Sequence, residues 1–274
     1  MSLHRGRPRA AGLALATTAA ASASLLTTPT AHAELSDPAE IYYGAIQTDE
    51  IVLGPNESTT FHIDFAVRDD SGMRVSGATA TLHGPGGRTL EATTTYPGIK
   101  TCMEISDTAA VCSFLLTVDT GEAEIDNGYA GTWSLSAMAF PKDTAWDGTP
   151  RPEGTVTADN LDTVTFKRDS KLSSDASPNV ASPGRTISVI GELEFADWTS
   201  GGYAPGAGQP LDLVFAPDDS PYYQYVDELT TYSNGWAFGS GEAEEDGSWF
   251  LAYQGSPTTE WVYSPFEHIN VRGR

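Results

Sequence analysis

Three histidines lie outside the N-terminal 33 residues, and none has the neighbours that catalysis requires. They are His62, His83 and His268. None adjoins a G-x-S-x-G nucleophile motif, and none belongs to an H-E-x-x-H zinc motif. We therefore expect a protein that is not an enzyme and has no cofactor. Because a catalytic triad can be assembled from residues that are distant in the sequence, a secreted hydrolase stays open as a third hypothesis.

Acidic side chains gather at predicted turns, where solvated carboxylates are common. The candidates for a metal site are Asp218, Asp219, Glu244, Glu245 and Asp246, with Asp69 and Asp70 as a further pair. Ca²⁺ takes about six to eight oxygen ligands, and turns between strands can supply them from carboxylates and backbone carbonyls. None of these stretches matches the calcium loop of an EF-hand. A solvated acidic surface and a calcium site are both open here.

The two cysteines, Cys102 and Cys112, are too far apart for a C-x-x-C redox motif and too few for a zinc site. Cys112 begins an alternating run with Phe114 and Leu116, and Asp107 lies midway between the two cysteines as a turn residue. The spacing therefore predicts a hairpin closed by a disulfide, in a compartment that permits disulfides.

Aromatic residues are dense in the second half of the chain, and two of them accompany a glycine-rich turn. In the stretch ADWTSGGYAPGAGQPLDLVF, the glycines and prolines predict a turn that leads into a strand from Pro210. We expect Trp198 and Tyr203 to fold over the end of a β-sandwich. The alternative is an exposed aromatic platform for a ligand, since Tyr and Trp are favoured at recognition surfaces.

The first 33 residues resemble a signal peptide. Arg5, Arg7 and Arg9 precede a small apolar stretch, and Ala31-His32-Ala33 fits an A-x-A cleavage site. No later stretch is long and apolar enough for a membrane span. The sequence thus predicts a secreted, extracellular protein.

The mature chain is strongly acidic. Cleavage removes three of the 15 basic residues and none of the 37 acidic ones, so the remaining carboxylates outnumber the cations by 25. Between Arg185 and Arg272 there are fourteen carboxylates and no Lys or Arg. A surface that reads nucleic acid needs a basic patch, and so does a surface that docks on anionic lipid. The charge balance therefore argues against both partners.

Alternation with a period of two dominates the chain and predicts β-strands. Phe61, Ile63, Phe65 and Val67 point one way, and similar runs begin at Cys112, Trp133 and Ile187. Turn signals such as Asn234-Gly235 separate the runs. Many short alternating strands predict an all-β protein built from sandwiches.

The chain divides into parts by composition. We expect a signal peptide at 1–33, a first β-sandwich at 34–170, a polar linker with the start of a strand at 171–184, and a second β-sandwich at 185–274. Gly131-Thr-Trp133 and Gly247-Ser-Trp249 begin a late strand in each half. This shared motif hints at two similar folds.

The second half resembles the immunoglobulin-like modules of secreted actinobacterial proteins. Its segments TISVIGELEFADW, GGYAPGAGQPLDLVFAP and DGSWFLAYQG carry the likeness. The matching positions are Gly191, Trp198, Tyr203, Gly208, Leu213, Phe215, Gly247, Trp249, Tyr253 and Gly255. The resemblance implies two immunoglobulin-like β-sandwich domains in tandem and an exported location, and it implies no catalytic residue.

From these observations we expect a secreted, non-enzymatic module that binds or spaces something. Its partner is an extracellular protein or a carbohydrate. The second hypothesis is a calcium-stabilised extracellular adhesion or sensing protein, whose metal would lie at the acidic turns.

Overall fold

The computed structural model describes residues 39–68, 73–94, 101–141 and 155–273. Across these ranges the chain forms 21 β-strands and two short 3-10 helices, η1 (Pro85–Gly87) and η2 (Asn127–Tyr129). The prediction of an all-β protein is therefore confirmed. The predicted signal peptide at 1–33 and the candidate carboxylates of Asp69 and Asp70 lie outside the described residues.

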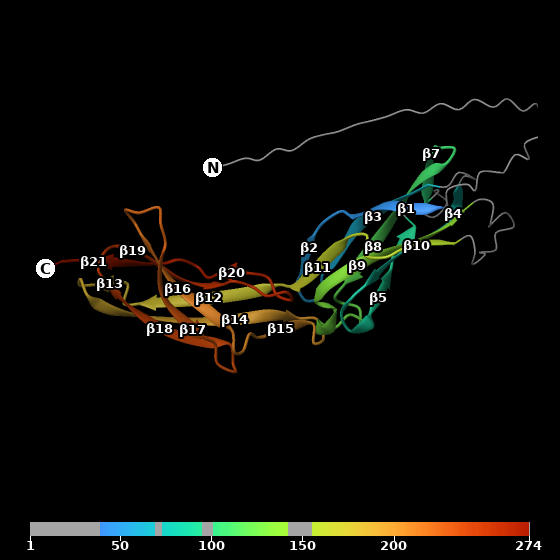
Figure 1. Cartoon of the computed structure of the whole chain (residues 1–274). Helices are drawn as coiled ribbons and strands as arrows, with labels where there is room; N and C mark the ends of the chain where they lie inside the picture. Colours follow the sequence, from blue (N-terminus) through green and yellow to red (C-terminus); the bar gives the residue numbers. More distant parts are fainter. Residues whose placement is uncertain (1–38, 69–72, 95–100, 142–154, 274) are drawn as a thin grey trace, which may run out of the picture. The chain divides into compact units, whose positions relative to one another are not determined.

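The first pair of sheets contains strands β1 to β11, coloured blue to yellow-green in Figure 1. One sheet has the order β1-β3-β8-β6, with β7 also paired to β8, and the other has the order β2-β11-β9-β4-β5, with β10 also paired to β9. The strands are β1 (Glu40–Ile46), β2 (Glu50–Leu53), β3 (Ser58–Arg68), β4 (Met73–His83), β5 (Thr89–Glu91), β6 (Thr93–Thr94), β7 (Cys102–Ser106), β8 (Ala109–Asp119), β9 (Gly131–Pro141), β10 (Val156–Ala158) and β11 (Thr163–Arg168).

The second pair of sheets contains strands β12 to β21, coloured yellow to red. One sheet has the order β12-β14-β15, with β18 also paired to β14, and the other has the order β13-β21-β19-β16-β17, with β20 also paired to β19. The strands are β12 (Ser170–Ser177), β13 (Val180–Ala181), β14 (Arg185–Asp197), β15 (Gly202–Pro205), β16 (Pro210–Pro217), β17 (Gln224–Thr230), β18 (Trp236–Ala243), β19 (Gly247–Tyr253), β20 (Val262–Tyr263) and β21 (Glu267–Val271).

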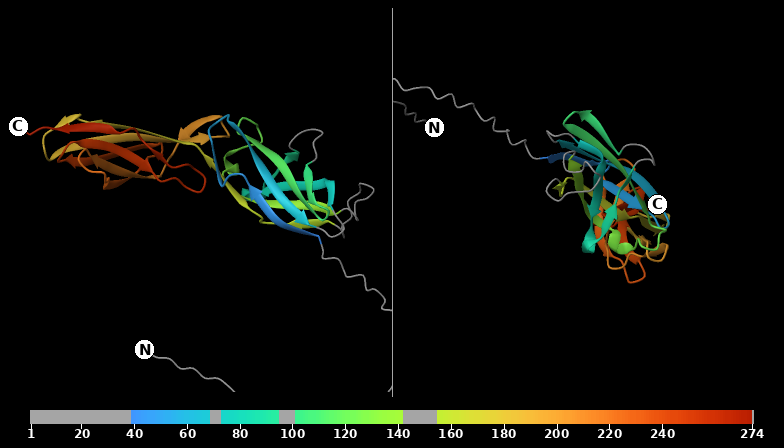
Figure 2. Two further views of the ribbon diagram at one scale, coloured as in Figure 1. Left: turned by 90° about the horizontal axis from the view of Figure 1, so that it is seen from above. Right: turned by 90° about the vertical axis from the view of Figure 1, so that its right-hand side faces the viewer.

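The central strands of both pairs of sheets have the same topology, and in each pair the two sheets form the layers of a sandwich (Figure 2). In one layer the first strand pairs with the third, as in β1–β3 and β12–β14. A short second strand crosses to the other layer and pairs in parallel with the last strand, as in β2–β11 and β13–β21. This is an immunoglobulin-like arrangement, so the predicted fold of two such sandwiches in tandem is confirmed.

The alternation seen in the sequence builds the core. In β3, Phe61, Ile63, Phe65 and Val67 are at most 3% exposed, whereas His62 on the opposite side is exposed. Antiparallel pairing with β8 places Phe65 opposite Cys112 and Ile63 opposite Phe114. Burial of one face of each sheet against the other thus follows directly from the period of two.

The repeated Gly-x-Trp motif occupies the same position in both sandwiches. Gly131 begins β9 and Gly247 begins β19, and Trp133 and Trp249 are both buried. Gly131 has a φ of 134°, which favours glycine, and a Cβ on Gly247 would lie 2.5 Å from the carbonyl oxygen of Ala216. The motif therefore marks the strand at which a close backbone approach is followed by a large core side chain.

Residues 171–184 are not a linker, so this prediction is wrong. β12 pairs with β14 along its whole length, from Ser170 opposite Phe195 to Ser177 opposite Ser188. Leu172 and Ala176 are buried, Ser174 between them is half-buried, and Ser173 and Asp175 are exposed. The segment looked polar because only one side of this edge strand contacts the core. The chain passes from the first pair of sheets to the second within Arg168 to Ser170, and whether each sandwich folds alone stays a prediction.

The predicted disulfide is present. Cys102 in β7 lies directly opposite Cys112 in β8, and the two sulfur atoms are bonded. Both cysteines are fully buried within the core of the first sandwich. The bond closes the predicted hairpin.

Candidate functional site

Aromatic rings cover part of the outer surface of the second sandwich, on the side of β16, β17, β19 and β20 that faces away from the core. We call this surface the aromatic face and define it by Tyr223, Tyr225, Phe250, Trp261, Tyr263 and Phe266. Five of these side chains are between 48% and 64% exposed, and Phe250 is 1% exposed. Since large exposed side chains of this kind are rarely gathered in one place on a monomer, the aromatic face is a candidate binding surface.

Phe250 lies at the centre of the aromatic face and is buried by the rings around it. Its ring centroid lies 4.2 Å from that of Phe266, 5.4 Å from that of Tyr223 and 5.8 Å from that of Tyr263. Trp261 extends the cluster, with its ring 5.3 Å from that of Tyr263. The rings meet at tilted or edge-on angles, which is a favourable geometry for aromatic pairs. They hold one another in place as a continuous apolar surface.

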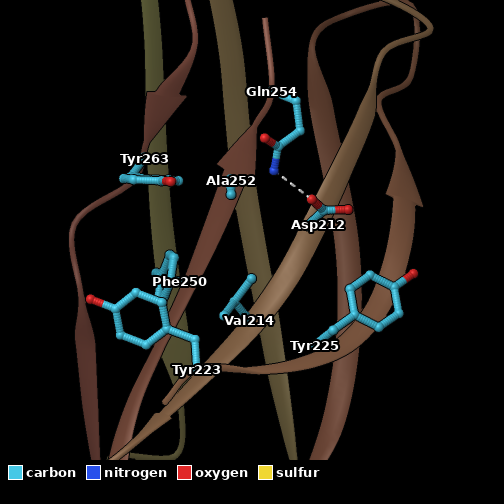
Figure 3. Close-up of a pocket in the computed structure, with 8 residues that line it drawn as sticks. All are labelled: Asp212, Val214, Tyr223, Tyr225, Phe250, Ala252, Gln254 and Tyr263. Carbon is cyan, nitrogen blue, oxygen red and sulfur yellow. Dashed lines mark hydrogen bonds between the residues drawn. The ribbon is translucent and has the colours of Figure 1, made fainter. Parts of the chain in front are cut away.

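A hollow of about 250 Å³ lies on this face. Val214 and Ala252 lie along its floor, and Tyr223 and Tyr225 lie on opposite sides of Val214 (Figure 3). The strand register explains the arrangement, because Val214 is paired with Phe250 on one side and with Tyr225 on the other. A hollow of this size suits a side chain or a small ring.

One end of the hollow is acidic. Asp212 accepts a hydrogen bond from the side-chain amide of Gln254 at 2.7 Å (Figure 3). Asp212 also lies opposite Glu228 across β16 and β17. Partial removal from water raises the pKa of Tyr225, and the negative charges of Glu228, Asp212 and Asp227 raise it further. The electrostatic potential at this end of the face is therefore negative.

The structure places Trp198 and Tyr203 at the junction of the two sandwiches, away from the aromatic face. Trp198 follows β14, yet its side chain is 3% exposed and belongs to the core of the first sandwich. The indole N–H donates to the carbonyl of Leu53 at 3.0 Å. Trp198 therefore cannot be a ligand platform. It covers the end of a sandwich as expected, but of the neighbouring one.

Tyr203 supports the same junction. Its hydroxyl donates to the carboxylate of Asp169 at 2.6 Å, and the ammonium of Lys171 lies 3.5 Å from the centre of its ring. Burial raises the pKa of Tyr203, and the hydrogen bond to Asp169 raises it further. These contacts give Tyr203 a structural role.

The acidic metal candidates are spread over turns at the far end of the second sandwich. The carboxylate of Asp218 pairs with Nε2 of His268 at 3.0 Å, and that of Asp246 accepts a hydrogen bond from the backbone of Val271. Asp219, Glu244 and Glu245 are exposed. Across the described part of the chain, no three His, Cys, Asp or Glu side chains are grouped to hold a metal ion. The calcium hypothesis therefore rests on the sequence pattern alone.

The three histidines lie in different sheets, His62 in β3, His83 in β4 and His268 in β21. His62 and His83 are exposed. We assign no catalytic function to any of them.

The density of aromatics is visible in the sequence, but their division into a core set and an outer set is not. Trp249 and Tyr253 belong to the core, whereas Phe250 between them points outward. The segment Trp249-Phe-Leu-Ala-Tyr253 is apolar at every position, and this continuous run is the signal that both sides of β19 are covered. No pattern in the sequence marks the other residues of this surface, which are Asp212, Val214, Ala252, Gln254 and Phe266.

Comparisons with known proteins give no family. No family model matches the sequence, and no curated protein matches it. Among the solved structures that are similar in part is FdeC, an Escherichia coli adhesin, with a TM-score of 0.33 and 15% identity. Another is a tetra-tandem repeat in the extending region of a large adhesion protein, with a TM-score of 0.31 and 11% identity.

The matches cover 86% of this chain and 64% of the adhesin chain, and 85% of this chain and 49% of the tandem-repeat chain. This chain thus spans less than two thirds of either structure. At these scores the likeness supports no functional argument. The class that the strands themselves define is an all-β protein with two immunoglobulin-like sandwiches. Within the described residues, no helix has the length and apolar character to cross a bilayer.

Proposed function

We propose that this chain is a non-enzymatic extracellular module that binds a partner polypeptide on the aromatic face of its second sandwich. The observation that carries the proposal is the cluster of five exposed rings around the buried Phe250, with a hollow beside it. Exposed apolar surface of this kind gains free energy when a partner removes it from water. Tyr and Trp are also enriched where proteins recognise one another.

A polypeptide fits this face better than a polysaccharide does. Sugars need several free hydrogen-bonding groups around the ring on which they stack. In the hollow, Asp212 and Gln254 bond to each other, so the remaining polar side-chain groups are the hydroxyls of Tyr223, Tyr225 and Tyr263. Phe250 and Phe266 have no polar atom. Because the rings meet edge-on, they present ridges and a pocket for side chains instead of one flat platform.

The extracellular location rests on two features. The N-terminal residues have the pattern of a signal peptide, and the disulfide between Cys102 and Cys112 is typical of oxidising compartments.

The first sandwich supports the second without adding to the binding surface. Trp198 anchors the junction in its core, and Asn127 and Asn56 form hydrogen bonds with Trp198 and Gly201 across it. We propose that this junction holds the second sandwich as a rigid part of the molecule.

The test is selection of a displayed random-peptide library on the exported protein. The enriched peptides should bind the wild type and lose binding to Ala252→Arg, which places a long charged side chain in the hollow. The matched control is Phe238→Arg, since Phe238 is 58% exposed on β18 in the opposite sheet. This control should bind like the wild type.

Two results would overturn the proposal. One is that no enriched peptide distinguishes Ala252→Arg from the control, in which case the aromatic face is not the binding surface. The other is a glycan that binds the wild type and is lost in Ala252→Arg, which would make the partner a carbohydrate. Circular dichroism of both variants confirms that they are folded.

A further inference from the structure

The acidic end of the aromatic face has an unusual pairing of charges. Asp212 in β16 lies directly opposite Glu228 in β17. Their neighbours Leu211 and Leu229 are also opposite each other and are both buried, so Asp212 and Glu228 share the outer side of the sheet. Like charges directly opposite on adjacent strands destabilise a sheet.

No cation of the second sandwich offsets this pair. The chain has no Lys or Arg between Arg185 and Arg272. Among the described residues, Asp212 bonds to the neutral amide of Gln254, and neither Asp212 nor Glu228 takes part in an ion pair. The carboxylates are thus available to a positive group from outside the chain.

An aromatic ring lies beside these carboxylates. Tyr225 is 64% exposed, borders the same hollow as Asp212, and precedes Asp227 and Glu228 in β17. A cation over an aromatic face is attracted by the ring electrons, and a carboxylate at the edge of that ring adds a charge-assisted hydrogen bond. An aromatic ring with carboxylates beside it is therefore a suitable binding site for an organic cation.

We infer that Tyr225, Asp212 and Glu228 form a cation-binding site, here called the seat, for an arginine or lysine side chain of the partner polypeptide. The remaining rings of the aromatic face contact the apolar residues beside that side chain. The inference rests on the proposed function and adds the chemical class of the partner, a basic segment with neighbouring apolar residues. Charge complementarity is the reason for this choice, because an acidic partner would meet only repulsion here. Arginine suits the seat better than lysine, since its planar guanidinium both stacks on a ring and bonds a carboxylate.

The experiment measures the affinity of the full exported protein for three labelled peptides. The first contains arginine and leucine in a glycine–serine background, the second has citrulline in place of arginine, and the third has aspartate. The arginine peptide should bind, the citrulline peptide should bind about tenfold more weakly, as expected for the loss of one charge-assisted contact, and the aspartate peptide should not bind.

Matched variants separate the seat from the general negative charge of the chain. Asp212→Asn with Glu228→Gln should weaken binding of the arginine peptide to the level of the citrulline peptide. Asp219→Asn with Glu244→Gln removes the same charge at exposed positions on other turns and should leave the affinity unchanged. At Tyr225, Phe should retain binding and Leu should weaken it, because this side chain attracts the cation through its ring and not through its hydroxyl.

Several outcomes would overturn the seat. Equal weakening by the two double variants would show attraction to the acidic chain as a whole. Equal binding of the arginine and citrulline peptides would show that charge has no role. The library selection could yield peptides that lose binding to Ala252→Arg but contain no basic residue. In that case the seat is wrong and the proposed function stands. If no peptide depends on Ala252, both are wrong.

Discussion

The indole Nε1 of Trp198 donates a hydrogen bond to the backbone carbonyl of Leu53 at 3.0 Å, across 145 residues of sequence. The backbone N–H of Trp198 donates to the side-chain oxygen of Asn127 at 2.9 Å. The side-chain nitrogen of Asn127 donates to the carboxylate of Asp197 at 2.6 Å. A residue that follows a strand of the second sandwich is thereby built into the core of the first. Trp198, together with Ala196, thus anchors the second sandwich in the core of the first.

Replacing Trp198 with Ala should therefore destabilise the first sandwich. We expect the free energy of unfolding to fall by about 3–5 kcal/mol, as for other buried large aromatics. Urea denaturation of the full chain measures the change. The control is Trp261→Ala, because Trp261 is 54% exposed and contributes little to a core. An unchanged midpoint for Trp198→Ala would mean that the junction is not an energetic contact.

The second sandwich should fold without the first. Its core is separate except for Ala196 and Trp198, which belong to the other cluster. A fragment of residues 170–274 should unfold cooperatively in urea, and the fluorescence of Trp198 should shift to the red relative to the full chain, since its ring would become exposed. A fragment without a cooperative transition would refute the predicted domain split.

The two tryptophans of the Gly-x-Trp motif should differ in their tolerance of phenylalanine. Nε1 of Trp133 donates to the carbonyl of Tyr129 at 2.9 Å, whereas Nε1 of Trp249 is buried without a partner. Trp133→Phe thus loses a hydrogen bond that Trp249→Phe does not. We expect Trp133→Phe to be more destabilising by about 1 kcal/mol. Thermal and urea unfolding of the two single variants test this, and an equal cost would contradict it.

The junction should make stability depend on pH through Glu260. The ammonium of Lys167 lies 2.6 Å from the carboxylate of Glu50 and 3.6 Å from that of Glu260. Burial raises the pKa of Glu260, and the neighbouring Glu50 raises it further, while Lys167 acts in the opposite direction. An acid whose folded-state pKa is raised stabilises the fold below its unfolded pKa, near about 4.3, and loses that contribution as pH rises through the folded-state pKa.

Glu260→Gln should remove the fall in unfolding free energy that Glu260 causes as pH rises. Relative to the wild type, the variant should gain stability between about pH 4 and pH 7, the interval above the ordinary glutamate pKa. Urea denaturation at each pH gives the difference in unfolding free energy. The matched control is Glu245→Gln at an exposed turn, which should show no such trend. A constant difference across this range would contradict the raised pKa.

Calcium should stabilise the protein no more than an equal ionic strength of sodium chloride does. At the acidic turns, Asp218 pairs with His268 and Asp246 accepts a hydrogen bond from the backbone N–H of Val271, so both carboxylates already have partners within the protein. We therefore expect either salt to act only by screening the repulsion among the carboxylates. The measurement is thermal unfolding in millimolar calcium and in matched sodium chloride. A bound ion would instead add about 2.7 kcal/mol at a hundredfold excess over Kd. A calcium-specific rise that disappears in Asp218→Asn with Asp219→Asn would favour the adhesion or sensing hypothesis.

The strands and their inner faces follow from the local sequence. Phe61, Ile63 and Phe65 alternate with polar residues, and a period of two allows only one side of the strand to enter the core. The pairing of Cys102 and Cys112 also follows from local spacing. The same logic, applied to Leu172 and Ala176, predicts β12 better than its polar composition predicts a linker.

The tertiary structure alone decided which surfaces those strands meet. The turn after β14 predicts that Trp198 folds over the end of a sandwich but not that it enters the core of the neighbouring one, because the partner surface comes from residues far away in the sequence. In the same way, Phe250 lies in a run that is apolar at every position. Because such a run does not alternate, the sequence does not show on which side of the strand Phe250 lies. The aromatic face exists because pairing of β16, β17, β19 and β20 brings together rings from β17, β19, β20 and the loops beside them. Packing between distant segments sets that neighbourhood, and no local pattern in the chain encodes it.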